Sequence, residues 1–159
     1  MSRIDDMIKE NMSDDGTILN LRDKYIGLRG TMEVAQKEIL KTVKVLTLSG
    51  NQTGDEGIEA LVECPYLQNV ETLNLNQNDI GDEGAIVLAN ATNLPKLTSL
   101  SLFGNIIGDE GARAFASSPQ SKKYIKLDLY KNQFSNDAIK ALTESENLKN
   151  CEELEIYRE

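Results

Sequence analysis

Short runs in which leucine alternates with polar residues recur along the chain at a constant interval. Four of them are LTLSGN (46–51), LNLNQN (73–78), LSLFGN (100–105) and LDLYKN (127–132), spaced 27 residues apart. Alternation of apolar and polar residues predicts a strand with one buried face, and a repeat of this length is typical of a solenoid. We therefore expect a stack of short strands, one from each repeat.

The residues that follow each run repeat as well. They read QTGDEG (52–57), DIGDEG (79–84), IIGDEG (106–111) and, more weakly, QFSNDA (133–138). The apolar spacing of the next segments, such as AIVLANA and ARAFASS, predicts helices of about two to three turns. Each repeat should contribute one strand and one helix, so the expected fold is an α/β solenoid with a parallel six-stranded sheet.

The 27-residue frame extends toward both ends of the sequence. It continues back to LNLRDK (19–24) and forward to LEIYRE (154–159), where Lys24 and Glu159 replace the asparagine. Residues 2–11 have the apolar spacing of a repeat helix. We expect a single domain over residues 1–159, divided into an N-terminal capping helix and turn at 1–15, five repeats at 16–150 and a terminal strand at 151–159.

Superposing the repeats places apolar residues at two strand positions and one helix position of each unit. These columns are Leu19, Leu46, Leu73, Leu100, Leu127 and Leu154; Leu21, Leu48, Leu75, Leu102, Leu129 and Ile156; and Val34, Leu61, Leu88, Phe115 and Leu142. With neighbouring strands ~4.8 Å apart, the columns are expected to stack into one continuous hydrophobic core.

The pattern LxxLxLxxN followed by IGDEGA resembles the leucine-rich repeats of the ribonuclease-inhibitor-like class, over residues 16–159. The resemblance implies a curved solenoid with the parallel sheet on its concave face and the helices on its convex face. It also implies that the repeated asparagines satisfy backbone groups at the turn after each strand. These asparagines are Asn51, Asn78, Asn105 and Asn132. The resemblance does not identify the function of the chain, because this class includes inhibitors, nucleotide-sensing receptors, actin-capping tropomodulins, Ran GTPase activators and bacterial effectors.

Charge and composition narrow the classes of function. The chain has 17 Lys and Arg against 26 Asp and Glu, a net charge of −9, which disfavours binding to nucleic acid and to anionic membranes. It contains no His, the commonest general base and metal ligand. We therefore expect no enzymatic activity, no cofactor and no metal ion.

The sequence also bears on localisation. The first dozen residues include acidic side chains, where a secretory signal would have an apolar core. No stretch of the sequence approaches the ~18 apolar residues of a membrane span. These features favour a cytoplasmic protein. A secreted bacterial effector without a cleavable signal has the same features and is the alternative.

The acidic pairs of the GDEG segments allow two interpretations. Their repetition in adjacent units could build a stacked calcium site, but one Asp-Glu pair per unit supplies too few oxygen ligands. We expect instead that each aspartate caps the helix that it begins, that negative charge complements the helix dipole, and that the flanking glycines allow a tight turn. The residues concerned are Asp55, Glu56, Asp82, Glu83, Asp109 and Glu110.

The two cysteines, Cys64 and Cys151, are more than three repeats apart. Stacking would separate them by ~15 Å, too far for a disulfide, so both are expected to be reduced. Cys151 aligns with Val43, Val70, Leu97 and Tyr124, which predicts a core position. Cys64 should lie in a loop beside Pro65, with no base to activate it.

The candidate binding site lies where the repeats vary. Strand residues between and after the leucines should face the concave side, and at the C-terminal end one such column holds Phe103, Tyr130 and Tyr157. Aromatic residues flanked by charges are favoured in binding hot spots. The flanking charged residues are Asp128, Lys131, Glu155 and Arg158. The alternative is that the aromatic column only stabilises a solvated sheet.

These features favour a non-catalytic module that binds a protein partner on the C-terminal half of the concave face. One alternative is a GTPase activator resembling the Ran activators, although the concave arginines are only Arg22 and Arg158 and those proteins have roughly twice as many repeats. Another is the recognition arm of a larger protein. The edge of the terminal strand is expected to pair with further chain or with a second copy, giving self-association.

Overall fold

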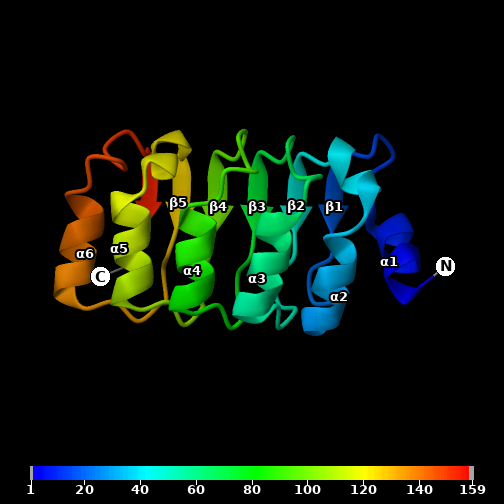
Figure 1. Cartoon of the computed structure of the whole chain (residues 1–159), viewed down its shortest axis with the longest axis horizontal. Helices are drawn as coiled ribbons and strands as arrows, with labels where there is room; N and C mark the ends of the chain where they lie inside the picture. Colours follow the sequence, from blue (N-terminus) through cyan, green and yellow to red (C-terminus); the bar gives the residue numbers. More distant parts are fainter. Residues whose placement is uncertain (1, 158–159) are drawn as a thin grey trace.

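The fold is a single-layer parallel sheet covered on one face by a row of helices (Figure 1). The computed structural model describes residues 2–157. Within that range the sheet has the strand order β1-β2-β3-β4-β5-β6, which confirms the predicted α/β solenoid. The strands are β1 (Ile18–Asn20), β2 (Val45–Thr47), β3 (Thr72–Asn74), β4 (Ser99–Ser101), β5 (Lys126–Asp128) and β6 (Glu153–Glu155).

The helices follow one another along the long axis of the molecule in the order of the sequence (Figure 1). They are α1 (Arg3–Asn11), α2 (Gly27–Val34), α3 (Gly54–Glu63), α4 (Asp82–Ala89), α5 (Asp109–Ser117) and α6 (Asn136–Thr143). Two 3₁₀ helices that the sequence pattern did not predict, η1 (Glu38–Thr42) and η2 (Pro119–Lys123), precede β2 and β5. We call the sheet face opposite the helices, predicted to be concave, the open face.

Every pair of neighbouring strands has the same register. Leu19 lies beside Leu46, Leu46 beside Leu73, and so on to Leu127 beside Leu154, so each step along the sheet is 27 residues. A one-residue slip would move every leucine to the open face. The constant register therefore confirms the repeat length that the sequence predicted.

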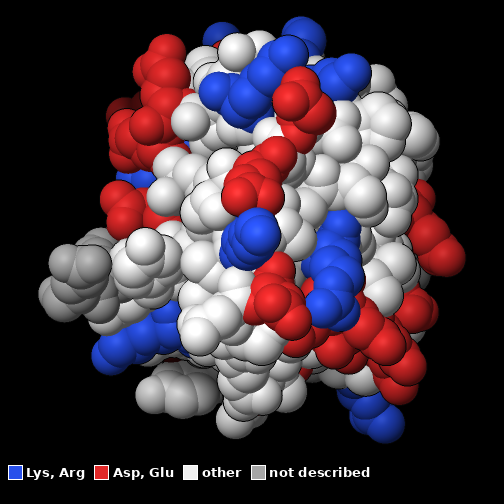
Figure 2. Space-filling model, turned by 90° about the vertical axis from the view of Figure 1, so that its left-hand side faces the viewer, with Lys and Arg blue, Asp and Glu red and all other residues white. Residues whose placement is uncertain are grey.

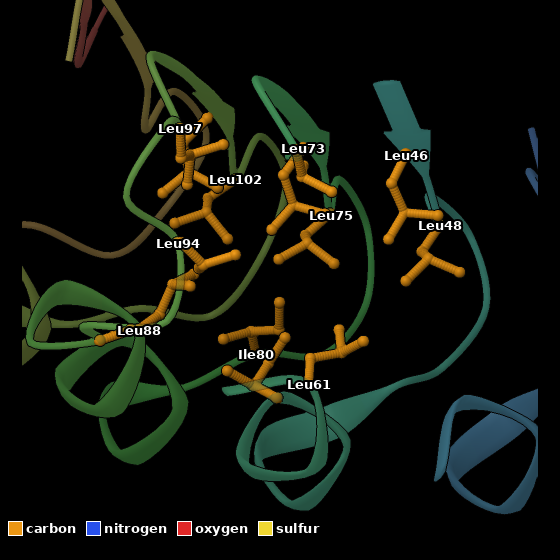
Figure 3. Packing of buried hydrophobic residues seen from close by; sticks show 14 of the residues in the cluster. Leu46, Leu48, Leu61, Leu73, Leu75, Ile80, Leu88, Leu94, Leu97 and Leu102 are labelled. Carbon is orange, nitrogen blue, oxygen red and sulfur yellow. The ribbon is translucent and has the colours of Figure 1, made fainter. Parts of the chain in front are cut away.

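The core lies between the sheet and the helices (Figure 3). Strand leucines such as Leu46 and Leu73 point toward Leu61 and Leu88 of the helices, and all four are almost fully buried (Figure 3). Burying a leucine side chain stabilises a fold by about 1.5–3 kcal/mol. Because each coil contributes the same few leucines, the core continues along the whole stack.

The repeated asparagines form a ladder at the ends of the strands, in which Asn51, Asn78 and Asn105 are buried and Asn132 is partly buried. The side-chain oxygen of Asn78 accepts hydrogen bonds from the backbone N–H groups of Asn51 (3.0 Å) and Thr53 (3.2 Å) of the preceding coil. Its amide group donates to the carbonyl of Leu48 at 3.0 Å. Asn51, Asn105 and Asn132 make equivalent contacts. The predicted structural role of these residues is confirmed.

The GDEG aspartates bond to a different helix from the one predicted. Asp82, in the first turn of α4, accepts from the N–H groups of Gly108 (2.8 Å) and Gly111 (2.9 Å) at the start of α5. Asp55 accepts from Gly81 at 2.7 Å, and Asp109 from the N–H of Ser135 at 2.8 Å. Each aspartate thus caps the helix of the following repeat, because that helix end lies beside its carboxylate. The acids connect neighbouring coils.

The GDEG glycines also have a different role from the one predicted. Gly81 and Gly108 have φ angles of −105° and −102°, so the backbone conformation does not require glycine there; Gly54, at φ +66°, does fit the tight-turn prediction. A Cβ on Gly111 would lie 2.5 Å from Ile107 Cγ2 and 2.9 Å from Ala85 Cβ. Glycine is needed at this position because Ile107 of the same coil and Ala85 of the preceding coil leave no room for a side chain.

Helix α1 covers the N-terminal end of the stack. Its Ile4 and Ile8 are buried against the first repeat, and Asp5 pairs with Lys37 at 2.7 Å. Ser2 and Asp5 cap the helix reciprocally through each other's backbone N–H groups.

The division of the chain into cap, repeats and terminal strand stays a prediction. Within residues 2–157, no helix combines the length and apolar character that crossing a bilayer needs.

Both cysteines are free thiols, as expected from their separation. Cys64 lies in the loop directly after α3, beside Pro65, as predicted; it is buried there, and this burial raises the pKa of its thiol. Cys151 differs from expectation. Val43, Val70 and Leu97 are fully buried, whereas Cys151 is only partly buried, because it belongs to the last described coil and is not packed between two others.

Candidate functional site

The open face is built from alternate strand residues. In β5, Leu127 points into the core, so Lys126 and Asp128 on either side of it face outward, and the same holds for Glu153 and Glu155 in β6. Tyr130 and Tyr157 continue the alternation two residues further along. The register places equivalent residues of neighbouring coils side by side.

Phe103 and Tyr130 are brought together at the C-terminal half of this face. Their ring centroids are 5.7 Å apart at an interplanar angle of 41°. Their backbones are fixed, since Phe103 N–H donates to Asn76 Oδ1 at 2.8 Å and Tyr130 N–H donates to Asp128 Oδ1 at 3.0 Å. Both rings are only partly exposed, because each covers part of the other. An aromatic pair of this kind contributes about 0.5–1.5 kcal/mol beyond its buried area.

Tyr157 presents the largest exposed aromatic surface of the predicted site. It is 57% exposed and occupies the position of Tyr130 in the next coil. Arg158, which was also predicted to take part, lies outside the described residues. The structure therefore brings Phe103 and Tyr130 into contact and leaves much of Tyr157 open to solvent.

The predicted charged residues surround these aromatic rings. Lys131 Nζ lies 5.9 Å from the centroid of the Phe103 ring, a cation–π distance. Asp128 and Glu155 are register partners on β5 and β6. Both carboxylates are partly exposed on the open face.

Two further charged residues of this face were missed by sequence reasoning. Lys126 and Glu153 stand just before the first leucine of β5 and β6, and they form an ion pair at 3.6 Å. Only the residues between and after the leucines were assigned to the open face. Strand alternation places the preceding residue there too, so the signal was present in the sequence.

The N-terminal half of the open face includes exposed aliphatic residues. Ile18 is 47% exposed there, and Val45, at the same strand position, is partly exposed. Ser49, which follows Leu48, is buried. Asn76 forms hydrogen bonds with its neighbours, because its side-chain oxygen accepts from Ser101 Oγ (2.6 Å) and from the Phe103 backbone.

The open face has no arrangement that indicates a metal centre. Among the described residues, no three His, Cys, Asp or Glu side chains form a group that could hold a metal ion. The GDEG aspartates instead accept hydrogen bonds between coils. What the open face offers chemically is aromatic surface bordered by charges.

Comparison with known proteins identifies the repeat. The family model described as "Leucine Rich repeat" matches residues 40–62, 66–89 and 93–116, and these segments coincide with coils of the observed solenoid. The chain contains leucine-rich repeats. The ribonuclease-inhibitor-like subclass is compatible with the 27-residue period and stays a prediction. Comparison with curated protein sequences gave no match.

Solved structures show the same fold. The structure titled "Leiomodin-1 Actin-Binding Site 2 (ABS2)" is similar with a TM-score of 0.67 and 19% identity, over 94% of this leucine-rich repeat chain and 90% of that one. The tropomodulin C-terminal domain from Caenorhabditis elegans has a TM-score of 0.67 and 14% identity, over 94% and 93% of the two chains. At these identities the likeness shows the fold alone.

Proposed function

We propose that this leucine-rich repeat protein is a non-catalytic module that binds a protein partner on the C-terminal half of its open face. The observation that carries the proposal is the contact between Phe103 and Tyr130 beside the exposed Tyr157. The surface comprises Phe103, Asp128, Tyr130, Lys131, Glu155 and Tyr157, with Arg158 as a further predicted member.

The composition of this surface supports binding rather than sheet stability alone. Aromatic residues with charged neighbours are enriched in interface hot spots. The contact between Phe103 and Tyr130 accounts for some stabilisation of the sheet, but Tyr157 is more than half exposed and gains little from burial. A partner that covered Tyr157 would remove apolar surface from water.

The similar structures support the proposal at the level of fold. The leiomodin-1 structure is titled as an actin-binding site, so a solenoid of this shape can act as a protein-binding domain. Sequence identity is too low to carry actin over as the partner. The partner is therefore defined by the chemistry of the open face.

Photo-crosslinking tests the proposal. A benzophenone amino acid in place of Tyr157 should crosslink the partner when the protein is exposed to a cell extract, because an aromatic side chain is replaced by another. The matched control is the same residue in place of Arg113, which is exposed on α5 at the helix side. Adducts from position 157 and none from 113 support the proposal, and the reverse result contradicts it.

A further inference from the structure

On the C-terminal half of the open face, two lysine side chains have nearby partners. Lys126 is held by Glu153 at 3.6 Å, and Lys131 lies over the Phe103 ring at 5.9 Å. Among the described residues of this surface, Asp128 and Glu155 carry the carboxylates that take no part in these two contacts. They are register partners on β5 and β6. Seen from the end that carries α6, acidic and basic side chains lie next to one another among uncharged residues (Figure 2).

Two carboxylates in register on neighbouring strands repel one another. Adjacent strands lie ~4.8 Å apart, and like charges directly opposite are destabilising. Asp128 has a local role, because its Oδ1 accepts from the backbone of Tyr130, but asparagine could accept the same bond. The negative charge itself therefore has no structural function in this contact.

Aromatic rings border the carboxylate pair on one side. Tyr130 and Tyr157 lie two residues beyond Asp128 and Glu155 on the same two coils. A cation placed across the carboxylates would thus also lie near an aromatic ring, where cation–π attraction adds to the charge pairing. Lys131 already makes such a contact with Phe103 within this surface.

We propose that Asp128 and Glu155, bordered by Tyr157, form a recognition site for an arginine side chain of the protein partner. The inference rests on the proposed function and names the chemistry of its partner. A guanidinium group is planar, donates from several N–H groups to two carboxylates at once and stacks on aromatic rings. The net charge of −9 also favours the approach of a basic segment. Calcium fits poorly, since it needs more oxygen ligands than two side chains supply.

Peptide titration followed by amide chemical shifts tests the site directly. The probe is the pentapeptide acetyl-Gly-Gly-Arg-Gly-Gly-amide, and its control replaces arginine with citrulline, which keeps the shape and loses the charge. The arginine peptide should shift the amides of Asp128, Tyr130 and Glu155. The citrulline peptide should bind at least ~10-fold more weakly, because its neutral side chain lacks the attraction between a positive charge and the two carboxylates.

A double variant, Asp128→Asn with Glu155→Gln, provides the second arm. It should lose the arginine-dependent shifts while its melting temperature stays equal or rises, since repulsion is removed and the hydrogen bond of residue 128 is retained. The proposal is overturned if the citrulline peptide binds equally, if the shifts lie away from Asp128, Tyr130 and Glu155, or if the double variant still binds the arginine peptide. These outcomes differ from a failure of the proposed function, which would appear as crosslinking from position 113 and none from position 157.

Discussion

At the residue scale, the aspartates of the GDEG segments show how a short motif connects neighbouring coils. Asp82 accepts from Gly108 and Gly111 in the next coil, and a Cβ on Gly108 would approach Asp82 Oδ2 to 3.1 Å. The acid and the glycine therefore belong to one contact. The sequence identified Asp82 as a capping residue, but not the helix that it caps, because that depends on the offset between coils.

Removing this carboxylate should weaken the contact between α4 and α5. Asp82→Ala leaves two backbone N–H groups without their acceptor, so we expect the free energy of unfolding to fall by about 1–2 kcal/mol. Urea unfolding followed by circular dichroism measures the change. The matched control, Glu83→Ala, removes an exposed neighbouring acid and should change stability by less than ~0.5 kcal/mol. Equal losses in both variants would contradict the inter-coil contact.

At the element scale, helix α1 depends on an ion pair as well as on apolar packing. A hydrogen bond from Lys37, together with one from the Ser2 backbone, lowers the pKa of Asp5 to about 2, from its ordinary 3.8. The folded state thus favours ionised Asp5. The contribution of this charge is fully present above about pH 4 and is lost as the pH falls through 2.

Asp5→Asn should therefore destabilise the docking of α1 at neutral pH and have little effect near pH 2. Asparagine retains an oxygen that can accept from the Ser2 backbone, so the variant removes mainly the charge. Hydrogen exchange of the α1 amides at pH 6, and unfolding by urea at both pH values, measure the difference. If Asp5→Asn lowers the free energy of unfolding by as much at pH 2 as at pH 6, the ion pair with Lys37 is not the cause of the destabilisation.

The elements also show what the sequence could predict. Strand and helix positions repeat with the 27-residue period, so all six strands and the repeat helices could be located from leucine spacing. The 3₁₀ helices η1 and η2 were missed, because their segments vary in sequence from repeat to repeat. At the candidate site, strand alternation predicted the outward position of Tyr130. It could not predict the contact with Phe103, which depends on side-chain rotamers, and the same alternation was not applied to Lys126 and Glu153.

At the scale of the whole molecule, the end that carries α6 and β6 differs from the end covered by α1. Thr143, Leu154, Ile156 and Tyr157 line a hollow of about 360 Å³ there. Leu154 is only partly buried, whereas Leu46, Leu73, Leu100 and Leu127 in the same column are almost completely buried. Partly covered apolar surface beside an edge strand favours pairing with another chain.

Self-association through this end is therefore expected to depend on concentration. Sedimentation equilibrium at micromolar protein should show a dimer fraction that rises with concentration. Thr143→Lys places a charge in the hollow and should reduce the dimer fraction. The control, Asn20→Lys at the opposite end of the open face, should leave the dimer fraction unchanged. A protein that stays monomeric throughout would exclude pairing through β6 under these conditions.

The measurement that tests the central claim most directly is the affinity of Tyr130→Ala for the crosslinked partner, determined by calorimetry beside Asn20→Ala and Glu59→Ala. If the C-terminal half of the open face is the binding surface, Tyr130→Ala should lose at least ~2 kcal/mol of binding free energy. Its free energy of unfolding should fall by about 1–2 kcal/mol, because the contact with Phe103 is lost while the ring itself is only partly buried. Both control variants should bind normally. Normal binding by Tyr130→Ala together with loss in Glu59→Ala, on the helix side, would contradict the account.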